Sequence, residues 1–386
     1  MKIEPKRIYL DHAATTPLCP AALAAMQEDH GNPSSLYEEG RLARQKIDAA
    51  REEVAAAIGC LFAEVLFTSS GTEAAQLAIL GLALGNPEPE RRRILWGAAE
   101  HHGVLESRFL LERLGYRVEE IPVNSWGAVE PARLVEAVSR DVLLVSIQSA
   151  NNELGTENPV PDLVQIAHAQ GAKFHTDAVQ SFLTRPIHWE EWPVDLMSVA
   201  AHKVNGPKGV GAVFARAGTP LEAVTRGGGQ ERDMRAGTEN VAGIIGFGAA
   251  VRWHRSHPEG VAHKRAARDR FLETLSQVAD VDWQLSVPVD RILPGHAHLR
   301  FLGVSAESLL ILADRHGLSL SSGAACSSGS VLPSHVLKAA GWSDEAAKEG
   351  LRVSFGVGST LVEAEEAARR LAELAGSILS RRKSAL

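Results

Sequence analysis

Short apolar runs alternate with longer amphipathic segments through most of the chain. The apolar runs have the length and composition of buried strands, and they fall at 64–68, 94–98, 116–123, 141–147, 172–175, 194–201 and 210–215. Amphipathic spacing predicts helices between or after them, over 40–58, 74–84, 162–170 and 241–257. A further single helix is expected to follow residues 100–103 and to end near Leu114. Strands that alternate with helices are typical of a parallel sheet with helices on both faces. The pattern therefore predicts an α/β fold.

The pattern changes after Pro258-Glu259-Gly260, which we interpret as a domain boundary. From about residue 262, helices and short strands predict a smaller α+β unit, and an amphipathic helix is expected over 361–380. A chain of 386 residues is long enough for two domains. We therefore expect one large domain and one small domain.

Polar residues follow several of the predicted strands. They are Ser70-Gly71-Thr72, His101, Asp177 and Lys203. Ligands of parallel sheets bind beyond the carboxyl ends of the strands, so these side chains are candidates for a site. Each also has an ordinary explanation when taken alone: a helix N-cap, a surface histidine or a solvated lysine. The start of the helix after residue 70 is equally suited to bind an anion such as phosphate.

Taken together, these residues suit one kind of cofactor chemistry. A lysine at the end of a buried strand has a lowered pKa, and its neutral amine can hold a carbonyl compound as an imine. Asp177 after a buried strand needs a cation, such as a pyridinium, as its partner. With a phosphate cradle at 70–72, these groups indicate pyridoxal phosphate. Arg352 in an apolar strand suits an amino-acid carboxylate, and His101 suits proton transfer.

The cysteines and the net charge further limit the classes of protein to which the chain can belong. Cys19, Cys60 and Cys326 form no C-x-x-C pair, which argues against a structural zinc site or a disulfide framework. Cys326 lies in a run of small polar residues, where an exposed thiol can act as a nucleophile. The formal net charge of −7 favours neither nucleic acid nor an anionic membrane. We expect no metal site, because the 15 histidines lack ligand spacing.

At this point the chain resembles a known family. Its motifs are similar to those of group I cysteine desulfurases (NifS/IscS-like), which belong to the class V aminotransferases with the pyridoxal phosphate fold type I. The matching stretches cover essentially the full length and are highly specific: 9–17 (YLDHAATTP), 31–34 (GNPS), 70–79 (SGTEAAQLAI), 100–102 (EHH), 151–156 (NNELGT), 175–180 (HTDAVQ), 202–211 (HKVNGPKGVG), 227–241 (GGGQERDMRAGTENV), 321–337 (SSGAACSSGSVLPSHVL) and 352–356 (RVSFG). The resemblance implies a large domain over 16–259 with a mainly parallel seven-stranded sheet, and a small α+β domain formed by 1–15 with 260–386.

The resemblance also implies roles for individual residues. Lys203 would bind pyridoxal 5′-phosphate covalently, Asp177 would pair with its ring nitrogen, and Gln180 with its ring hydroxyl. His101 would stack on the ring and act as acid and base. The remaining cofactor-binding residues would be Gly71, Thr72, Asn152 and His202, with Thr238 reaching in from the second subunit of a homodimer.

The implied reaction converts L-cysteine to L-alanine. Asn32, Asn152 and Arg352 would hold the substrate, and Cys326 would accept its sulfur as a persulfide. An acceptor protein, either a scaffold or a sulfur carrier, would then receive the sulfur in the cytoplasm. Iron–sulfur clusters, thiolated tRNA, other thio-cofactors and sulfur-modified DNA remain open as its destination. A selenocysteine lyase or another class V aminotransferase is the alternative reading, and a non-catalytic sulfur-carrier partner or scaffold that kept the fold is a further one.

Two features depart from the family pattern. Ala200 stands where relatives usually have Ser or Thr, so one hydroxyl contact with the phosphate is missing and weaker cofactor retention is expected. The chain also ends soon after its last predicted helix, whereas the iron–sulfur branch uses a longer tail to dock its scaffold protein. This second departure puts that partner in doubt. The lack of an apolar segment near the N-terminus predicts no secretory signal, and no run is long enough to span a membrane.

Overall fold

The computed structural model describes residues 6–27, 31–323 and 333–384. Its largest element is a seven-stranded sheet of order β2-β8-β7-β6-β5-β3-β4. The strands are β2 (Val65–Thr68), β3 (Arg93–Gly97), β4 (Arg117–Ile121), β5 (Val142–Ser146), β6 (Lys173–Asp177), β7 (Leu196–Ala200) and β8 (Gly211–Ala215). Only β8 runs antiparallel to its neighbours, β2 and β7, and the other pairs are parallel. The predicted α/β fold with a mainly parallel seven-stranded sheet is confirmed.

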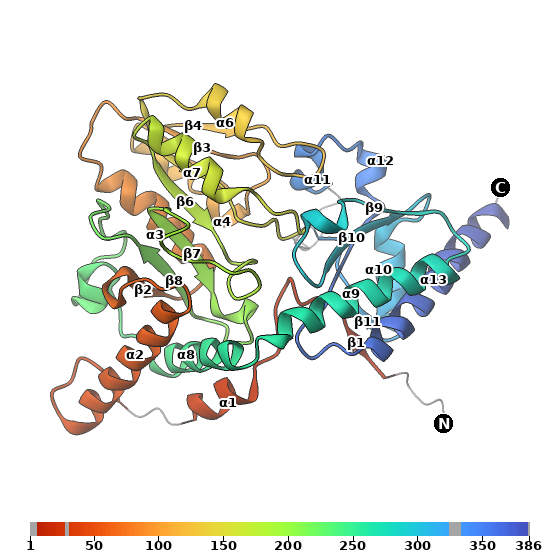
Figure 1. Cartoon of the computed structure of the whole chain (residues 1–386), viewed down its shortest axis with the longest axis horizontal. Coiled ribbons are helices and arrows are strands. Elements are labelled where there is room, and N and C mark those ends of the chain that lie inside the picture. The colour runs from red at the N-terminus through yellow and green to blue at the C-terminus, as the bar shows by residue number, and fades with distance from the viewer. Residues whose placement is uncertain (1–5, 28–30, 324–332, 385–386) are drawn as a thin grey trace.

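Helices cover both faces of this sheet (Figure 1). Alternation along β2 sends Phe67 to one face and Leu66 to the other, where they join separate apolar clusters. The first cluster is covered by α2 (Glu38–Ala56), α6 (Pro131–Ala137), α7 (Val160–Ala169) and α8 (Val241–Ser256). The second is covered by α3 (Gly71–Leu84), α4 (His102–Leu105) and α5 (Arg108–Arg113). The short helix α1 (Pro20–Met26) packs on α8.

One predicted helix is divided in two. The sequence predicted a single helix ending near Leu114, but the structure has α4 and α5 with Glu106 and Ser107 between them. The amide of Ser107 bonds to the carbonyl of Val104, three residues back, and this tightens the turn and redirects the chain.

A second group of elements lies beside the large sheet, at the right in Figure 1. It contains a three-stranded antiparallel sheet of order β12-β10-β9 and a parallel pair of short strands, β1 with β11. These strands are β1 (Ile8–Tyr9), β9 (Trp283–Leu285), β10 (His296–Phe301), β11 (Leu318–Ser319) and β12 (Gly350–Ser354). The helices are α9 (Glu259–Val278), α10 (Ala306–Arg315), α11 (His335–Ala339), α12 (Asp344–Ala347) and α13 (Leu361–Ser384).

This second group has its own apolar core, and the N-terminal strand belongs to it. Ile8 and Leu10 pack in one cluster with Phe271 and Leu371. The division of the chain into 16–259 and 1–15 with 260–386 stays a prediction. None of the helices in the described part of the chain combines the length and the apolar character needed to cross a bilayer.

Candidate active site

The carboxyl ends of neighbouring strands bring the predicted site residues to one edge of the large sheet. β6 ends at Asp177, which is in register with Ser198 of β7. β7 ends at Ala200 and is followed by a 3-10 turn, Ala201–Lys203. His101 follows β3, and α3 begins directly after β2. This is the edge at which parallel sheets bind ligands.

Lys203 presents its amine to this edge. Its Nζ donates to the carbonyl oxygens of Ala13 and Ala14, at 2.9 Å for Ala14, so the N-terminal segment crosses the site. Burial and the positive charge of Arg352 lower the pKa of Lys203 to about 8, whereas the charges of Asp177 and Asp11 act in the opposite direction. A much larger fraction of this amine is therefore neutral near pH 8 than in an ordinary lysine.

Asp177 and Gln180 lie beside Lys203. Asp177 Oδ1 accepts a hydrogen bond from the amide of Val179 at 2.9 Å. Burial raises the pKa of Asp177 to about 6, although the hydrogen bond from Val179 and the charge of Lys203 both favour its ionised form. Gln180 Nε2 donates at 3.0 Å to the same Ala13 carbonyl that Lys203 uses. A cation close to Asp177 would offset the burial of its charge.

His101 is placed by the start of α4. It is the N-cap of that helix, and its Nδ1 accepts from the amide of Gly103 at 3.0 Å. This bond assigns the proton of the neutral ring to Nε2. Burial and the charge of Lys203 lower the pKa of His101 to about 4, so the ring is neutral at physiological pH. A Cβ placed on Gly103 would lie 3.1 Å from His101 Nδ1 and 3.2 Å from Thr72 Oγ1, so Gly103 lets these two side chains approach each other.

A small cavity of about 300 Å³ lies at the N-terminus of α3. Ser70 caps this helix by accepting from the amide of Glu73 at 3.1 Å, and it lines the cavity together with His202 and Lys208. His202 Nδ1 is 3.2 Å from Thr15 Oγ1. A helix N-terminus with basic side chains suits a phosphate group. The anion pocket, the Lys203 amine and the Asp177 carboxyl together fit pyridoxal phosphate.

Arg352 lies on β12 and enters the site from the second group of elements. Its Nη2 donates to Asp11 Oδ1 at 2.6 Å, and its Nη1 donates to the carbonyl oxygen of Asn152 at 2.8 Å. Arg352 is only 4% exposed, and its Nε has no partner among the described residues. The structure thus brings Arg352 next to Asn152 and adds Asp11, which sequence reasoning did not single out. The role of Asn152 and Arg352 in substrate binding stays a prediction.

Two buried carboxyl groups at the site were also missed. Glu100 Oε1 accepts from the amide of Gln148 at 2.7 Å, and burial raises the pKa of Glu100 well above its usual range. Burial also raises the pKa of Glu153, which accepts a hydrogen bond from Ser334. The sequence did hold a signal for both residues: Glu100 precedes His101, and Glu153 lies inside the 151–156 motif. Cys326 lies outside the described residues.

Asn32 and Thr238 are not brought to this edge within the described part of the chain. Asn32 is exposed in a turn, where its Oδ1 accepts from the amide of Ser34 at 3.0 Å. This is the Asx turn that such a sequence ordinarily forms. Thr238 is exposed and precedes Glu239, which pairs with Arg44. The roles of Asn32 in substrate binding and of Thr238 in a partner subunit stay predictions.

The segment that carries Thr238 is held by a buried ion pair. Arg51 on α2 and Glu231 form two hydrogen bonds of 2.7 Å, and their side chains are 2% and 1% exposed. Glu231 also accepts from the amide of Phe67, and Glu231, Arg232 and Asp233 all have left-handed backbone conformations, with φ of 46°, 57° and 64°. The ion pair therefore fixes a strained turn to the edge of the large sheet.

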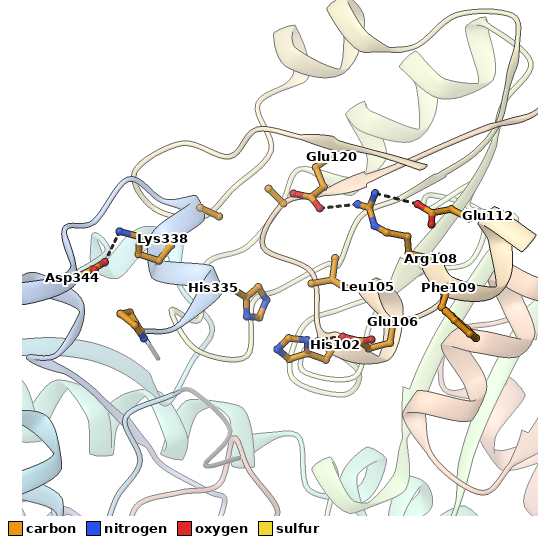
Figure 2. A pocket seen from close by; sticks show the side chains of 13 residues that line it. His102, Leu105, Glu106, Arg108, Phe109, Glu112, Glu120, His335, Lys338 and Asp344 are labelled. Atoms are coloured by element: carbon orange, nitrogen blue, oxygen red, sulfur yellow. Dashed lines mark hydrogen bonds and ion pairs between the residues drawn. The ribbon is translucent and has the colours of Figure 1, made fainter. Parts of the chain in front are cut away.

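A larger pocket of about 860 Å³ opens between α4, α5 and α11 (Figure 2). The ring centroids of His102 and His335 lie 4.5 Å apart in it. Its charged groups pair with one another, as Arg108 does with Glu120 at 2.8 Å. Neither Lys203, Asp177 nor Arg352 lines this pocket, so it is separate from the group of residues around Lys203.

Comparisons with known proteins agree with this geometry. The aminotransferase class-V family model matches residues 8–366. The chain is 42% identical to cysteine desulfurase IscS of Dictyoglomus turgidum over 361 residues, which are 92% of this chain and 91% of the relative. A solved NifS-like protein aligns with a TM-score of 0.88 and 32% identity, over 96% of this chain and 99% of the other. SspA in complex with cysteine aligns with a TM-score of 0.79 and 31% identity, over 90% and 98%.

Proposed function

Because this chain belongs to the aminotransferase class-V family and is a cysteine desulfurase, we propose that it binds pyridoxal phosphate at Lys203 and transfers the sulfur of L-cysteine to Cys326. Enzymes of this family depend on that cofactor. One observation carries the proposal for this chain: the half-buried Lys203 amine, the Asp177 carboxyl and the anion pocket at α3 lie at one edge of the sheet.

The cofactor would be held by groups already in place. Ser70, Gly71 and Thr72 at the N-terminus of α3, with His202, would bind the phosphate, and Lys203 would form the covalent attachment. Asp177 would keep the ring nitrogen protonated, and Gln180 would bind the ring hydroxyl. Bound pyridoxal phosphate supplies an electron sink for negative charge on the substrate.

The chain's own residues would hold the substrate and move its protons. Arg352 binds the carboxylate of L-cysteine, with Asn152 beside it, and a contribution from Asn32 stays a prediction. Lys203 takes a proton from the substrate and returns it, and its pKa of about 8 suits both directions near neutral pH. His101 is neutral at that pH, so its ring can accept a proton or donate the one on Nε2.

Sulfur transfer would use Cys326. Its thiolate attacks the substrate sulfur, the bond from that sulfur to the substrate's β-carbon breaks, and the electron pair stays on carbon. Protonation of that carbon gives L-alanine, and Cys326 keeps the sulfur as a persulfide. A scaffold or sulfur-carrier protein then takes the sulfur. The likeness to SspA, whose solved structure is a complex with cysteine, supports this substrate.

The proposed assembly is a cytoplasmic homodimer. Thr238 of one subunit would complete the phosphate site of the other. The exposure of Thr238 supports this, as does the buried Arg51–Glu231 pair that fixes the segment carrying it.

The test combines labelling with two matched cysteine variants. Borohydride reduction and peptide mapping are expected to place the cofactor on Lys203, and the protein is expected to release sulfide and alanine from L-cysteine. Cys326→Ser should abolish sulfide release, whereas Cys60→Ser should not, because burial raises the pKa of the Cys60 thiol to about 12. Amino transfer to a keto acid in place of sulfide release would instead support an aminotransferase, and a preference for selenocysteine would support a lyase.

A further inference from the structure

Lys208 lies in the turn that follows Lys203, and it lines the cavity of about 300 Å³ at the N-terminus of α3. The residue is exposed. Its amine forms no ion pair or hydrogen bond within the described part of the chain. The side chain of Lys208 is therefore free to contact a ligand that enters the cavity.

The backbone on both sides of Lys208 is held in place. Before it, Asn205 has a left-handed conformation with φ of 58°, and its amide donates to Thr16 Oγ1 at 2.7 Å. After it, Gly209 has φ of 78°, and its carbonyl oxygen accepts from Asn240 Nδ2 at 3.0 Å. A glycine adopts this conformation without strain. The turn thus fixes the base of the Lys208 side chain beside the cavity before any ligand binds.

Lys208 carries the only full charge among the described residues that line the cavity at neutral pH. Burial, with the charges of Lys203 and Lys208, lowers the pKa of His202 to about 4, so that ring is neutral. The hydroxyl and main-chain groups of the other lining residues carry no net charge. Those residues are Ala14, Thr15, Ser70, Gly209 and Val210. A phosphate group, by contrast, carries a charge of about −1.5 to −2 near pH 7.

The neighbouring wall of the site lacks one neutral donor. Ala200 ends β7 and has no hydroxyl group, and a Cβ placed on Gly71 would lie 3.2 Å from its side chain. Neither residue offers a side-chain hydrogen bond to an anion at the start of α3. Binding of a phosphate there depends on main-chain amides, on hydroxyl groups and on charge. The charge comes from Lys208.

We propose that Lys208 supplies the positive charge that binds the phosphate group of pyridoxal phosphate. The inference rests on the proposed function, because it concerns the cofactor of that same site. It assigns to one exposed lysine much of the preference for pyridoxal phosphate over pyridoxal. Because salt screens exposed charges, this preference should weaken as the salt concentration rises.

A purely structural role for Lys208 predicts something different. If the side chain only helped to form the turn, its replacement would weaken the binding of pyridoxal phosphate and of pyridoxal equally. If it binds the phosphate group, its replacement weakens only pyridoxal phosphate. The two compounds differ in that group alone, and both can react with Lys203, so their affinities separate the two roles.

The experiment titrates apo-protein carrying Lys208→Met with each compound and follows the absorbance. It uses about 10 mM and about 1 M salt, where the Debye lengths are about 30 Å and about 3 Å. In low salt, the Kd for pyridoxal phosphate is expected to rise about five- to tenfold, as for the loss of one ionic contact in water. The Kd for pyridoxal should stay within about twofold of wild type, and in high salt the rise for pyridoxal phosphate should fall to less than half.

Two variants and one further ligand serve as controls. Lys208→Arg keeps the charge and should bind both compounds as wild type does. Lys348→Met removes an exposed lysine that does not line the cavity, and it should also leave both affinities unchanged. Inorganic phosphate, titrated as a competitor of pyridoxal phosphate, tests the same contact without the Lys203 amine. Its inhibition constant should rise in Lys208→Met by the same factor.

The change in Kd for pyridoxal phosphate divided by the change for pyridoxal decides the outcome. A ratio of about threefold or more in low salt that falls in high salt supports the inference. A smaller ratio, a ratio that salt does not change, or an equal ratio for Lys208→Arg overturns it. If Lys208→Met does not fold by circular dichroism, Lys208→Gln replaces it. Wild-type protein that binds neither compound at Lys203 overturns the proposed function itself, whereas normal wild-type binding with a smaller ratio overturns only the role of Lys208.

Discussion

Ala200→Ser adds one hydroxyl group to the wall of the phosphate pocket. Ala200 is the last residue of β7 and is 2% exposed. A Cβ placed on Gly71 would lie 3.2 Å from the Ala200 side chain, so position 200 faces the start of α3. Gly71 has no side chain there, which leaves room for a hydroxyl that points to a bound phosphate.

The expected gain follows from one hydrogen bond to a charged group. Such bonds contribute about 1.5–3 kcal/mol, which corresponds to a roughly 10- to 150-fold lower Kd for pyridoxal phosphate. In the protein without cofactor, the new hydroxyl could form a different hydrogen bond. Ala200 is the N-cap of the turn at 201–203 and makes no side-chain cap bond, so a serine could cap that turn and contribute about 1 kcal/mol of stability instead.

Measuring both cofactor affinity and the stability of the apo-protein shows whether the hydroxyl binds the phosphate or caps the turn. Apo-protein is titrated with pyridoxal phosphate by absorbance, and its unfolding is followed in urea. Ala201→Ser is the matched control, since it adds the same hydroxyl one residue further, where the side chain faces Gly206. A Kd within twofold of wild type, or an equal gain for Ala201→Ser, would refute the role assigned to Ala200.

Three further changes test other parts of the site. Uptake of pyridoxal phosphate by the apo-protein should speed up from pH 6.5 to 9 with a midpoint near 8, because Lys203 reacts as the neutral amine; a midpoint near the ordinary value of 10.5 would contradict this. Asp177→Asn should lower kcat by at least about 100-fold with the fold intact by circular dichroism, because the ring nitrogen loses its carboxylate; near-normal turnover would remove Asp177 from the mechanism. Glu231→Gln should lower the free energy of unfolding in urea by about 3–5 kcal/mol, because Arg51 stays buried without its partner. Asp344→Asn, which breaks an exposed pair with Lys338, serves as its control and should leave that free energy essentially unchanged.

The grouping of Asp177, His101 and Lys203 was predictable from sequence. Each follows an apolar run, and the carboxyl ends of parallel strands meet at one edge whatever the order of the strands. Strand order did not need to be known for this inference. The same reasoning placed the anion pocket at residues 70–72, because the helix that begins there follows a strand of the same sheet.

The contacts that complete the site were beyond sequence reasoning. Arg352 and Asp11 are 341 positions apart, and no periodic pattern links them. The acceptors for the amine of Lys203 are main-chain carbonyls of Ala13 and Ala14, which leave no trace in side-chain identity. Both contacts depend on how the first residues of the chain pack against its last third, which is a long-range backbone arrangement.

That arrangement has a consequence for biosynthesis. β1 pairs with β11 at Ile8 and Leu318, and the residues that follow β1 cover Lys203. A ribosome must therefore synthesise more than three hundred residues before the partner of the first strand emerges. The large sheet, complete by Ala215, can form earlier, but the amine pocket closes only late in translation. Pyridoxal phosphate should accordingly bind only after the nearly finished polypeptide is released. Nascent chains truncated before β11 should remain colourless when pyridoxal phosphate is supplied.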